Sequence, residues 1–160
     1  MMEKQELKKQ LLLYGDAYSL LREALKEFPL EMWKFKPSAP EWSIHEIIVH
    51  LADSEANSYI RCRYLIAEPG KTILAYNQDL WAVKLDYHSQ STDKALELFR
   101  LLREASYLLI KDLPGEVWSN TINHPENGLM TMYEWLVVYA NHIPGHIGQM
   151  QRVYQRWKKS

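Results

Sequence analysis

Apolar residues recur at alternating steps of four and three along the first part of the chain. They are Leu7, Leu11, Tyr14, Tyr18, Leu21, Leu25 and Phe28. Such steps bring side chains to one face of an α-helix, so the pattern predicts a helix from Glu3 to Phe28 with that face toward a bundle core. Pro29 closes this helix, and Pro37 and Pro40 predict a loop over 35–41 because proline cannot continue a helix interior.

A second helix is predicted to begin at a capping box. The Ser43 hydroxyl can accept a bond from the backbone N–H three residues on, where the Glu46 side chain reaches back. The helix is expected to run to about Ala67, since a Pro-Gly pair follows at 69–70. The connection over 71–91 is too long for a tight turn, which indicates a crossover or a lid with a short helical turn near 79–84.

A third helix is predicted from Thr92 to Leu113, ended by the Pro-Gly pair at 114–115. The residues assigned to its inward face are Leu98, Phe99, Leu102, Ala105, Leu109 and Leu113. A small hairpin is expected within 117–130, around the turn sequence Pro-Glu-Asn-Gly. Thr131 and Glu134 repeat the capping-box spacing and predict a last helix running toward Trp157.

These patterns together predict the fold class. Four amphipathic helices, a long connection between the second and third, and no parallel-strand pattern are typical of an all-α four-helix bundle. The length of 160 residues suits one domain over 1–160. The expected fold is therefore a single four-helix bundle with a long crossover connection between helices 2 and 3.

The charge of the chain limits the classes of partner that we expect, and its cysteine content indicates the cellular compartment. The chain carries 19 basic and 20 acidic residues, so no overall field attracts it to nucleic acid or to an anionic membrane. No run of about 18 apolar residues suggests a membrane span. Cys62 is the single cysteine, which excludes an intramolecular disulfide and favours a reducing compartment. We therefore expect a cytoplasmic protein with a small-molecule substrate.

Histidines in two predicted helices are the candidate metal ligands. His142 and His146 are four residues apart, which places them on one helix face about 6 Å apart along the axis, where two imidazoles can converge on one ion. His50 lies in the middle of the second helix on a polar stripe with Asp53 and Asn57. Core packing or surface exposure is the alternative for a histidine pair alone.

The three remaining histidines are interpreted differently. His45-Glu46 followed by His50 looks like the His-Glu-x-x-His zinc motif, but it has one residue too many. Five steps turn a helix by about 500°, so His45 is expected on another face as a surface residue of the first turn. His88 and His124 fall in predicted loops without a spaced partner and are expected to be solvated.

The ordered set of motifs resembles the DinB family of DinB/YfiT-like metalloproteins. The shared features are Trp-Ser-Ile at 42–44, His-Leu-Ala-Asp at 50–53 and His-x-x-x-His-x-x-Gln at 142–149. The resemblance covers nearly the whole chain. It implies a four-helix bundle, often a homodimer, with a divalent ion such as zinc or nickel held by three histidines. These roles transfer to His50, His142 and His146.

Pro144 departs from what a regular helix allows between two ligands. Proline lacks a backbone donor and collides with the carbonyl of Ala140, which costs about 3 kcal/mol in a helix interior. The helix is expected to kink there. A tight kink would separate the imidazoles of His142 and His146, whereas a local bulge could reorient one of them as a ligand.

Three neutral imidazoles would leave a bound ion with an open position, at which water or a thiol becomes a nucleophile near neutral pH. Asp53 could orient a ligand or accept a proton, and Gln149 could hydrogen-bond the reacting group; both could equally be supporting or exposed polar residues. The first hypothesis is a metal-dependent enzyme, either a hydrolase or an S-transferase for a low-molecular-weight thiol such as bacillithiol or mycothiol. The candidate substrate contacts are the aromatic residues of the long connection, Tyr76, Trp81 and Tyr87, for which core packing is the alternative.

The second hypothesis is a non-catalytic metal-binding stress-response bundle, in which the ion only ties helices together. A fourth protein ligand would favour that reading, and an open position beside a pocket would favour catalysis. DNA binding is suggested only by the family's name, and the balanced charge argues against it.

Overall fold

The computed structural model describes residues 4–125 and 128–160, which contain five α-helices, three short 3₁₀ helices and one β-hairpin. The α-helices are α1 (Lys4–Leu25), α2 (Ile44–Ala67), α3 (Gln78–Lys84), α4 (Thr92–Ile110) and α5 (Met132–Trp157), and the strands are β1 (Thr121–His124) and β2 (Gly128–Thr131). Glu3 and the middle of the expected Pro-Glu-Asn-Gly turn lie outside the described residues. Among the helices described, none is both long and apolar enough to span a membrane.

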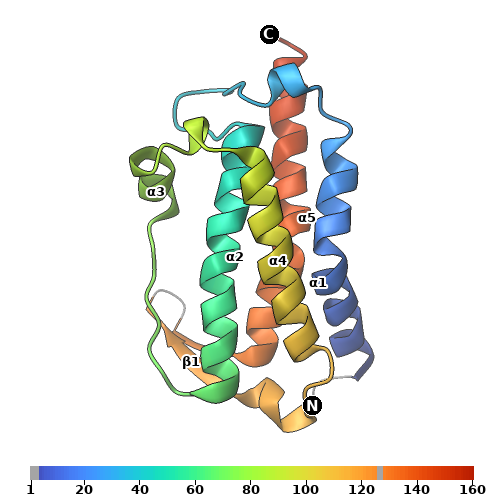
Figure 1. Ribbon diagram of the computed structural model, residues 1–160, viewed down its shortest axis with the longest axis vertical. Coiled ribbons are helices and arrows are strands. Elements are labelled where there is room, and N and C mark those ends of the chain that lie inside the picture. Colours follow the sequence, from blue (N-terminus) through green and yellow to red (C-terminus); the bar gives the residue numbers. More distant parts are fainter. Residues whose placement is uncertain (1–3, 126–127) are drawn as a thin grey trace.

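The four long helices form a bundle in which α1 and α5 run one way and α2 and α4 run the other (Figure 1). α1 packs mainly on α5 and α4, and α2 packs on the same two helices, so α1 and α2 lie diagonally opposite. The segment from Glu68 to Ser91 returns along the length of the bundle and carries α3 (Figure 1). The predicted bundle with a long crossover is therefore confirmed.

Local capping explains where these helices begin. Both predicted capping boxes are present: Ser43 and Thr131 each accept from the backbone of the glutamate three residues on, and each glutamate side chain accepts from the N-cap backbone. Asn77 caps the short helix α3 through a bond from Leu80 N–H. Each cap supplies an acceptor for an N–H group that the first helical turn leaves without a partner.

The inward face of α4 differs from the prediction. Leu98 and Leu109 are 45% and 42% exposed, and Ala105 is also exposed. The buried residues of this helix are Ala95, Leu96, Phe99, Arg103, Ser106 and Ile110. The prediction placed the leucines of α4 in the core. Instead, the face with the polar residues Arg103 and Ser106 is buried, because Arg103 has a charged partner in the core.

That partner is Glu55 of α2, and the Arg103 guanidinium also lies over the rings of Tyr14 and Phe99, which belong to two apolar clusters of the core. The Arg103 guanidinium donates to both carboxylate oxygens of Glu55, at 2.9 and 2.6 Å, and both side chains are at most 2% exposed. Arg103 Nη1 also donates to the backbone carbonyls of Tyr14 and Tyr139. One side chain of α4 thus contacts all three other helices of the bundle.

Candidate metal centre

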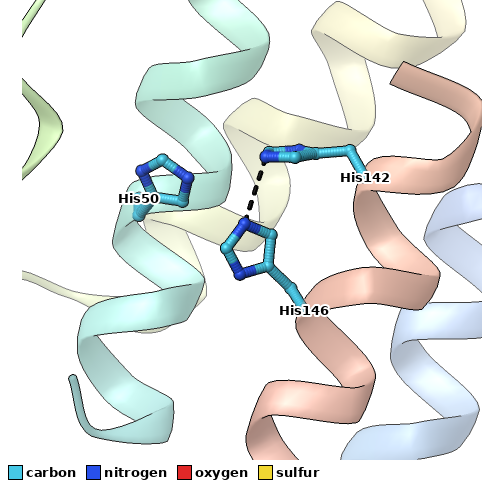
Figure 2. Close-up of side chains that lie close together, drawn as sticks. All are labelled: His50, His142 and His146. Carbon is cyan, nitrogen blue, oxygen red and sulfur yellow. Dashed lines mark hydrogen bonds between the residues drawn. The ribbon is translucent and has the colours of Figure 1, made fainter. Parts of the chain in front are cut away.

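Three histidines from two helices face one another inside the bundle. His50 projects from α2, and His142 and His146 project from successive turns of α5 toward it (Figure 2). The ring centroids of His50 are 5.6 Å from His142 and 4.9 Å from His146, and those of His142 and His146 are 4.5 Å apart. One ring nitrogen from each residue lies within 4.8 Å of the other two. The structure therefore brings together the three residues singled out in the sequence.

His50 is the most enclosed member of this histidine cluster. Its side chain is 1% exposed and packs against the indole of Trp42, with ring centroids 4.7 Å apart. Neither Nδ1 nor Nε2 of His50 has a hydrogen-bond partner among the described residues, although both atoms are buried. Burying a polar group without a partner costs free energy, so the position fits a residue whose lone pair has another use, such as binding a cation.

The orientation of His146 is set by Gln149, one turn further along α5. His146 Nδ1 lies 2.8 Å from Oε1 of Gln149, and because this oxygen can only accept, Nδ1 is the atom that carries the hydrogen. The lone pair of His146 is then on Nε2, which lies 3.1 Å from Nε2 of His142. Gln149 therefore aims a ligand-competent nitrogen at the centre of the cluster.

The spacing of these nitrogens suits a shared cation. Two imidazole nitrogens bound to a tetrahedral zinc at about 2.0–2.1 Å lie roughly 3.4 Å apart. The 3.1 Å between His142 and His146 is close to that value. Within the described residues, no carboxylate or thiolate joins the three imidazoles, so the cluster offers three protein donors.

Burial keeps the imidazoles neutral, which is the form that binds metals. Burial, with a smaller contribution from His146, lowers the pKa of His50 to about 3. Burial and the neighbouring histidines lower the pKa of His142 to about 2. The pKa of His146 is also lowered by burial, against the opposing effect of its bond to Gln149. All three rings thus stay neutral at neutral pH, and each has one nitrogen lone pair that a metal ion can bind.

Pro144 does not separate the ligands. The helix α5 is continuous from Met132 to Trp157 with Pro144 inside it, and Pro144 itself is exposed. His142 and His146 converge as an i, i+4 pair in spite of the proline. Of the two outcomes considered from the sequence, the separation of the imidazoles is the one that the structure excludes.

Asp53 and Tyr87 form a separate contact. Tyr87 is fully buried and donates a hydrogen bond of 2.5 Å to Oδ2 of Asp53. Burial and this bond raise the pKa of the Tyr87 hydroxyl well above its ordinary value. Asp53 therefore fixes an aromatic residue of the long connection onto α2, which fits the supporting role that the sequence also allowed for it.

The expectations for the other histidines need correction. His45 was expected at the surface, but it is 7% exposed and its Nε2 lies 2.8 Å from the carbonyl oxygen of Gln90. His124 was expected to be solvated, but it is 6% exposed on β1. His88 is half-buried, with its ring 5.9 Å from that of His45. These three rings lie outside the histidine cluster, and those of His45 and His88 contact residues that are distant in sequence.

Two residues near the histidine cluster were not predicted from the sequence. Tyr139, one turn before His142 on α5, has its ring centroid 6.0 Å from that of His142. Arg61 of α2 donates from Nη1 to the Tyr139 hydroxyl at 3.0 Å. No local spacing links these residues, because 78 positions separate them. Only the packing of α2 on α5 places them together.

Known proteins resemble this chain along most of its length. A family model of the DinB superfamily matches residues 13–150. A protein of Oceanobacillus iheyensis named "Putative metal-dependent hydrolase" is 30% identical over 115 residues, which are 72% of this chain and 66% of that protein. One of Halalkalibacterium halodurans with the same description is 26% identical over 117 residues, or 73% of this chain and 68% of the relative. The chain thus spans about two thirds of the length of these relatives.

A solved structure matches the fold. YfiT from Bacillus subtilis, described as "a probable metal-dependent hydrolase with an unusual four-helix bundle topology", superposes with a TM-score of 0.89 at 21% identity. The match covers 99% of this chain and 91% of that one, which shows a common bundle topology. With the family match over residues 13–150, these findings establish that the chain belongs to the DinB superfamily.

Proposed function

We propose that this protein is a divalent-metal-dependent hydrolase whose ion is held by His50, His142 and His146. One observation carries the proposal: His50 is buried in the core with both ring nitrogens unpartnered, 4.9 Å from the ring of His146. A histidine kept only for packing would be replaceable by an apolar residue at a lower desolvation cost. The names of the relatives support the same class of reaction.

Three imidazoles suit zinc or nickel, and we propose one of these as the resident ion. When bound, the ion supplies a Lewis acid that activates water for attack on a polarised carbonyl. The chain's own residues prepare the site: Gln149 fixes the tautomer of His146, and Trp42 covers the ring of His50. Such contacts orient metal ligands and strengthen binding.

Transfer of a small thiol to an electrophile is the second candidate reaction. It uses the same ion, since a coordinated thiol loses its proton readily. Cys62 is fully buried, so a reacting thiol would have to come from the substrate. A third possibility, a purely structural ion that ties α2 to α5, predicts metal binding without metal-dependent turnover.

Metal analysis of the purified protein tests the ligand assignment. We expect about one divalent ion per chain in the wild type and its loss in the His50→Ala and His142→Ala variants. His88→Ala is the matched control, because it removes an imidazole outside the cluster and should keep the ion. Full retention of metal in the His142→Ala variant would refute the assignment.

A substrate screen then separates the three functions. Metal-loaded and chelator-treated protein would be compared on ester and amide substrates, and on bacillithiol or mycothiol with a simple electrophile. Metal-dependent hydrolysis supports the proposed function, and metal-dependent thiol consumption supports the second candidate. Stoichiometric metal with no turnover in either screen would favour the structural ion.

A further inference from the structure

A polar pocket of about 410 Å³ lies between α2, α5 and the long connection. It is lined by Ser54 and Arg61 of α2, Tyr139 of α5, residues 75–78 of the connection and His124 of β1. The walls come from four separate segments, so the pocket exists only in the folded chain. It lies beside the long connection, whose aromatic residues are the predicted substrate contacts.

This pocket adjoins the histidine cluster along both helices. Ser54 is one helical turn beyond His50 on α2, and Tyr139 is one turn before His142 on α5. The Tyr139 ring, which lines the pocket, has its centroid 6.0 Å from that of His142. A small molecule in the pocket would therefore contact Tyr139, whose ring lies between the pocket and His142.

Arg61 gives the pocket a positive charge, although the carboxylate of Asp53 lies close enough to affect the pKa of Tyr76 in the same lining. Its guanidinium donates to two neutral acceptors: Nη1 to the Tyr139 hydroxyl at 3.0 Å, and Nη2 to the carbonyl of Leu74 at 3.3 Å. Among the described residues, no aspartate or glutamate lines the pocket, and Arg61 forms none of the ion pairs. A guanidinium has five N–H donors, so donors remain for a further acceptor.

Two tyrosines line this wall: Tyr139, whose hydroxyl can donate to a ligand, and Tyr76, whose hydroxyl already hydrogen-bonds with Ser54. The Tyr139 oxygen accepts from Arg61, which leaves the hydroxyl hydrogen for another acceptor. Burial raises the pKa of both Tyr139 and Tyr76, so both hydroxyls keep their hydrogens at neutral pH. Tyr76 is held in place by Trp81, with ring centroids 4.5 Å apart. The wall therefore combines one cation with a hydroxyl donor, the pattern that recognises an anion.

We propose that this pocket binds the carboxylate of a small substrate, with Arg61 as the charge partner and Tyr139 as a hydroxyl donor. A carboxylate fits better than a phosphate because the described lining carries one formal cation, which balances one negative charge. The scissile ester or amide would then lie toward His142. The inference rests on the proposed hydrolase for the reaction, but the binding of the carboxylate is independent of it.

Binding of matched probes tests the pocket without turnover. N-acetylglycine and N-acetylglycinamide differ only in the carboxylate, and their binding to the full chain can be followed by two-dimensional NMR. We expect the carboxylate to bind roughly tenfold or more tightly than the amide, with shifts at residues 75–78. Equal binding of the two probes, tighter binding of inorganic phosphate, or shifts confined elsewhere would overturn the proposal.

Variants assign the effect to the pocket. Arg61→Gln should abolish the preference for the carboxylate, and Tyr139→Phe should weaken it. Arg63→Gln is the matched control, because Arg63 lies on the same helix with its guanidinium 3.1 Å from the Tyr59 ring centroid, away from the pocket. A preference that survives Arg61→Gln would overturn the proposal, and the wild-type comparison and Tyr139→Phe still test it if that variant fails to fold.

The two proposals can fail separately. The titration is repeated on chelator-treated protein and on His142→Ala, in which the proposed metal site is broken. Carboxylate-selective binding that persists in these samples supports the pocket even if the protein contains no metal. Metal binding and hydrolysis without any carboxylate preference would support the proposed function and refute the pocket.

Discussion

Removing Arg103 from the core should destabilise the protein far more than a surface arginine would. In Arg103→Met, Glu55 loses two charge-assisted bonds and keeps the bond from the Tyr14 hydroxyl at 3.1 Å. A buried charge stripped of its partner typically costs about 3–5 kcal/mol of the free energy of unfolding. We expect a loss in that range, a large part of the stability of an ordinary domain.

The double variant Glu55→Met, Arg103→Met provides the decisive comparison. It removes both charges, so no unpaired ion is left in the core. Replacing a buried ion pair by apolar side chains of similar size is often neutral or stabilising. The carbonyls of Tyr14 and Tyr139 still lose a donor, which is a smaller cost. The double variant should therefore be more stable than either single variant.

Urea unfolding of the chelator-treated protein measures these differences without a contribution from bound metal. Arg100→Met is the matched control on the same helix, because Arg100 pairs with Glu97 and Glu104 at the surface and its loss should have little effect. If the cost in the double variant equals the sum of the two single costs, the charges are not coupled and the reasoning is wrong.

Three further predictions concern the histidine cluster. Chelator-treated protein should lose stability as the pH falls from about 6.5 toward 3, because burial holds the pKa of His50 at about 3 and the unfolded chain takes up a proton that the folded chain does not. In urea titrations at several pH values, His50→Leu should remove up to about 1.4 kcal/mol per pH unit of that slope, and an unchanged slope would contradict the burial effect. Gln149→Leu should weaken metal binding roughly 10- to 100-fold in a chelator competition, whereas Gln151→Leu, on an exposed position of the same helix, should not. Pro144→Ala restores a helical backbone donor and should raise the free energy of unfolding by about 1–3 kcal/mol, so a stability at or below that of the wild type would refute this account of the proline.

Features set by neighbours in the chain were predicted well from the sequence. The two capping boxes join residues three positions apart, and the helix starts at Ser43 and Thr131 follow from that local geometry. The i, i+4 spacing of His142 and His146 likewise depends on one helix. The bundle with its long crossover followed from four such helices and from the length of one connection, and the resemblance to the DinB family supplied the set of three histidines.

Features that depend on which helices pack together could not be predicted from the sequence. The leucines of α4 suggested one inward face, but the pairing of Arg103 with Glu55, 48 positions away, turned another face into the core. His45 looked exposed because the Gln90 carbonyl that it contacts is 45 positions away in sequence. A local sequence pattern predicts the helix in which a residue lies, but it does not predict which distant segment will bury that residue.

The histidine cluster joins both kinds of information. The sequence placed two of its rings on one face of α5 and the third on a polar stripe of α2. The packing of α2 on α5 decided that the three rings meet, and it also created the Arg61 and Tyr139 wall beside them. Spacing along a helix is fixed by backbone geometry within a few residues, whereas a distance between helices depends on every side chain packed between them.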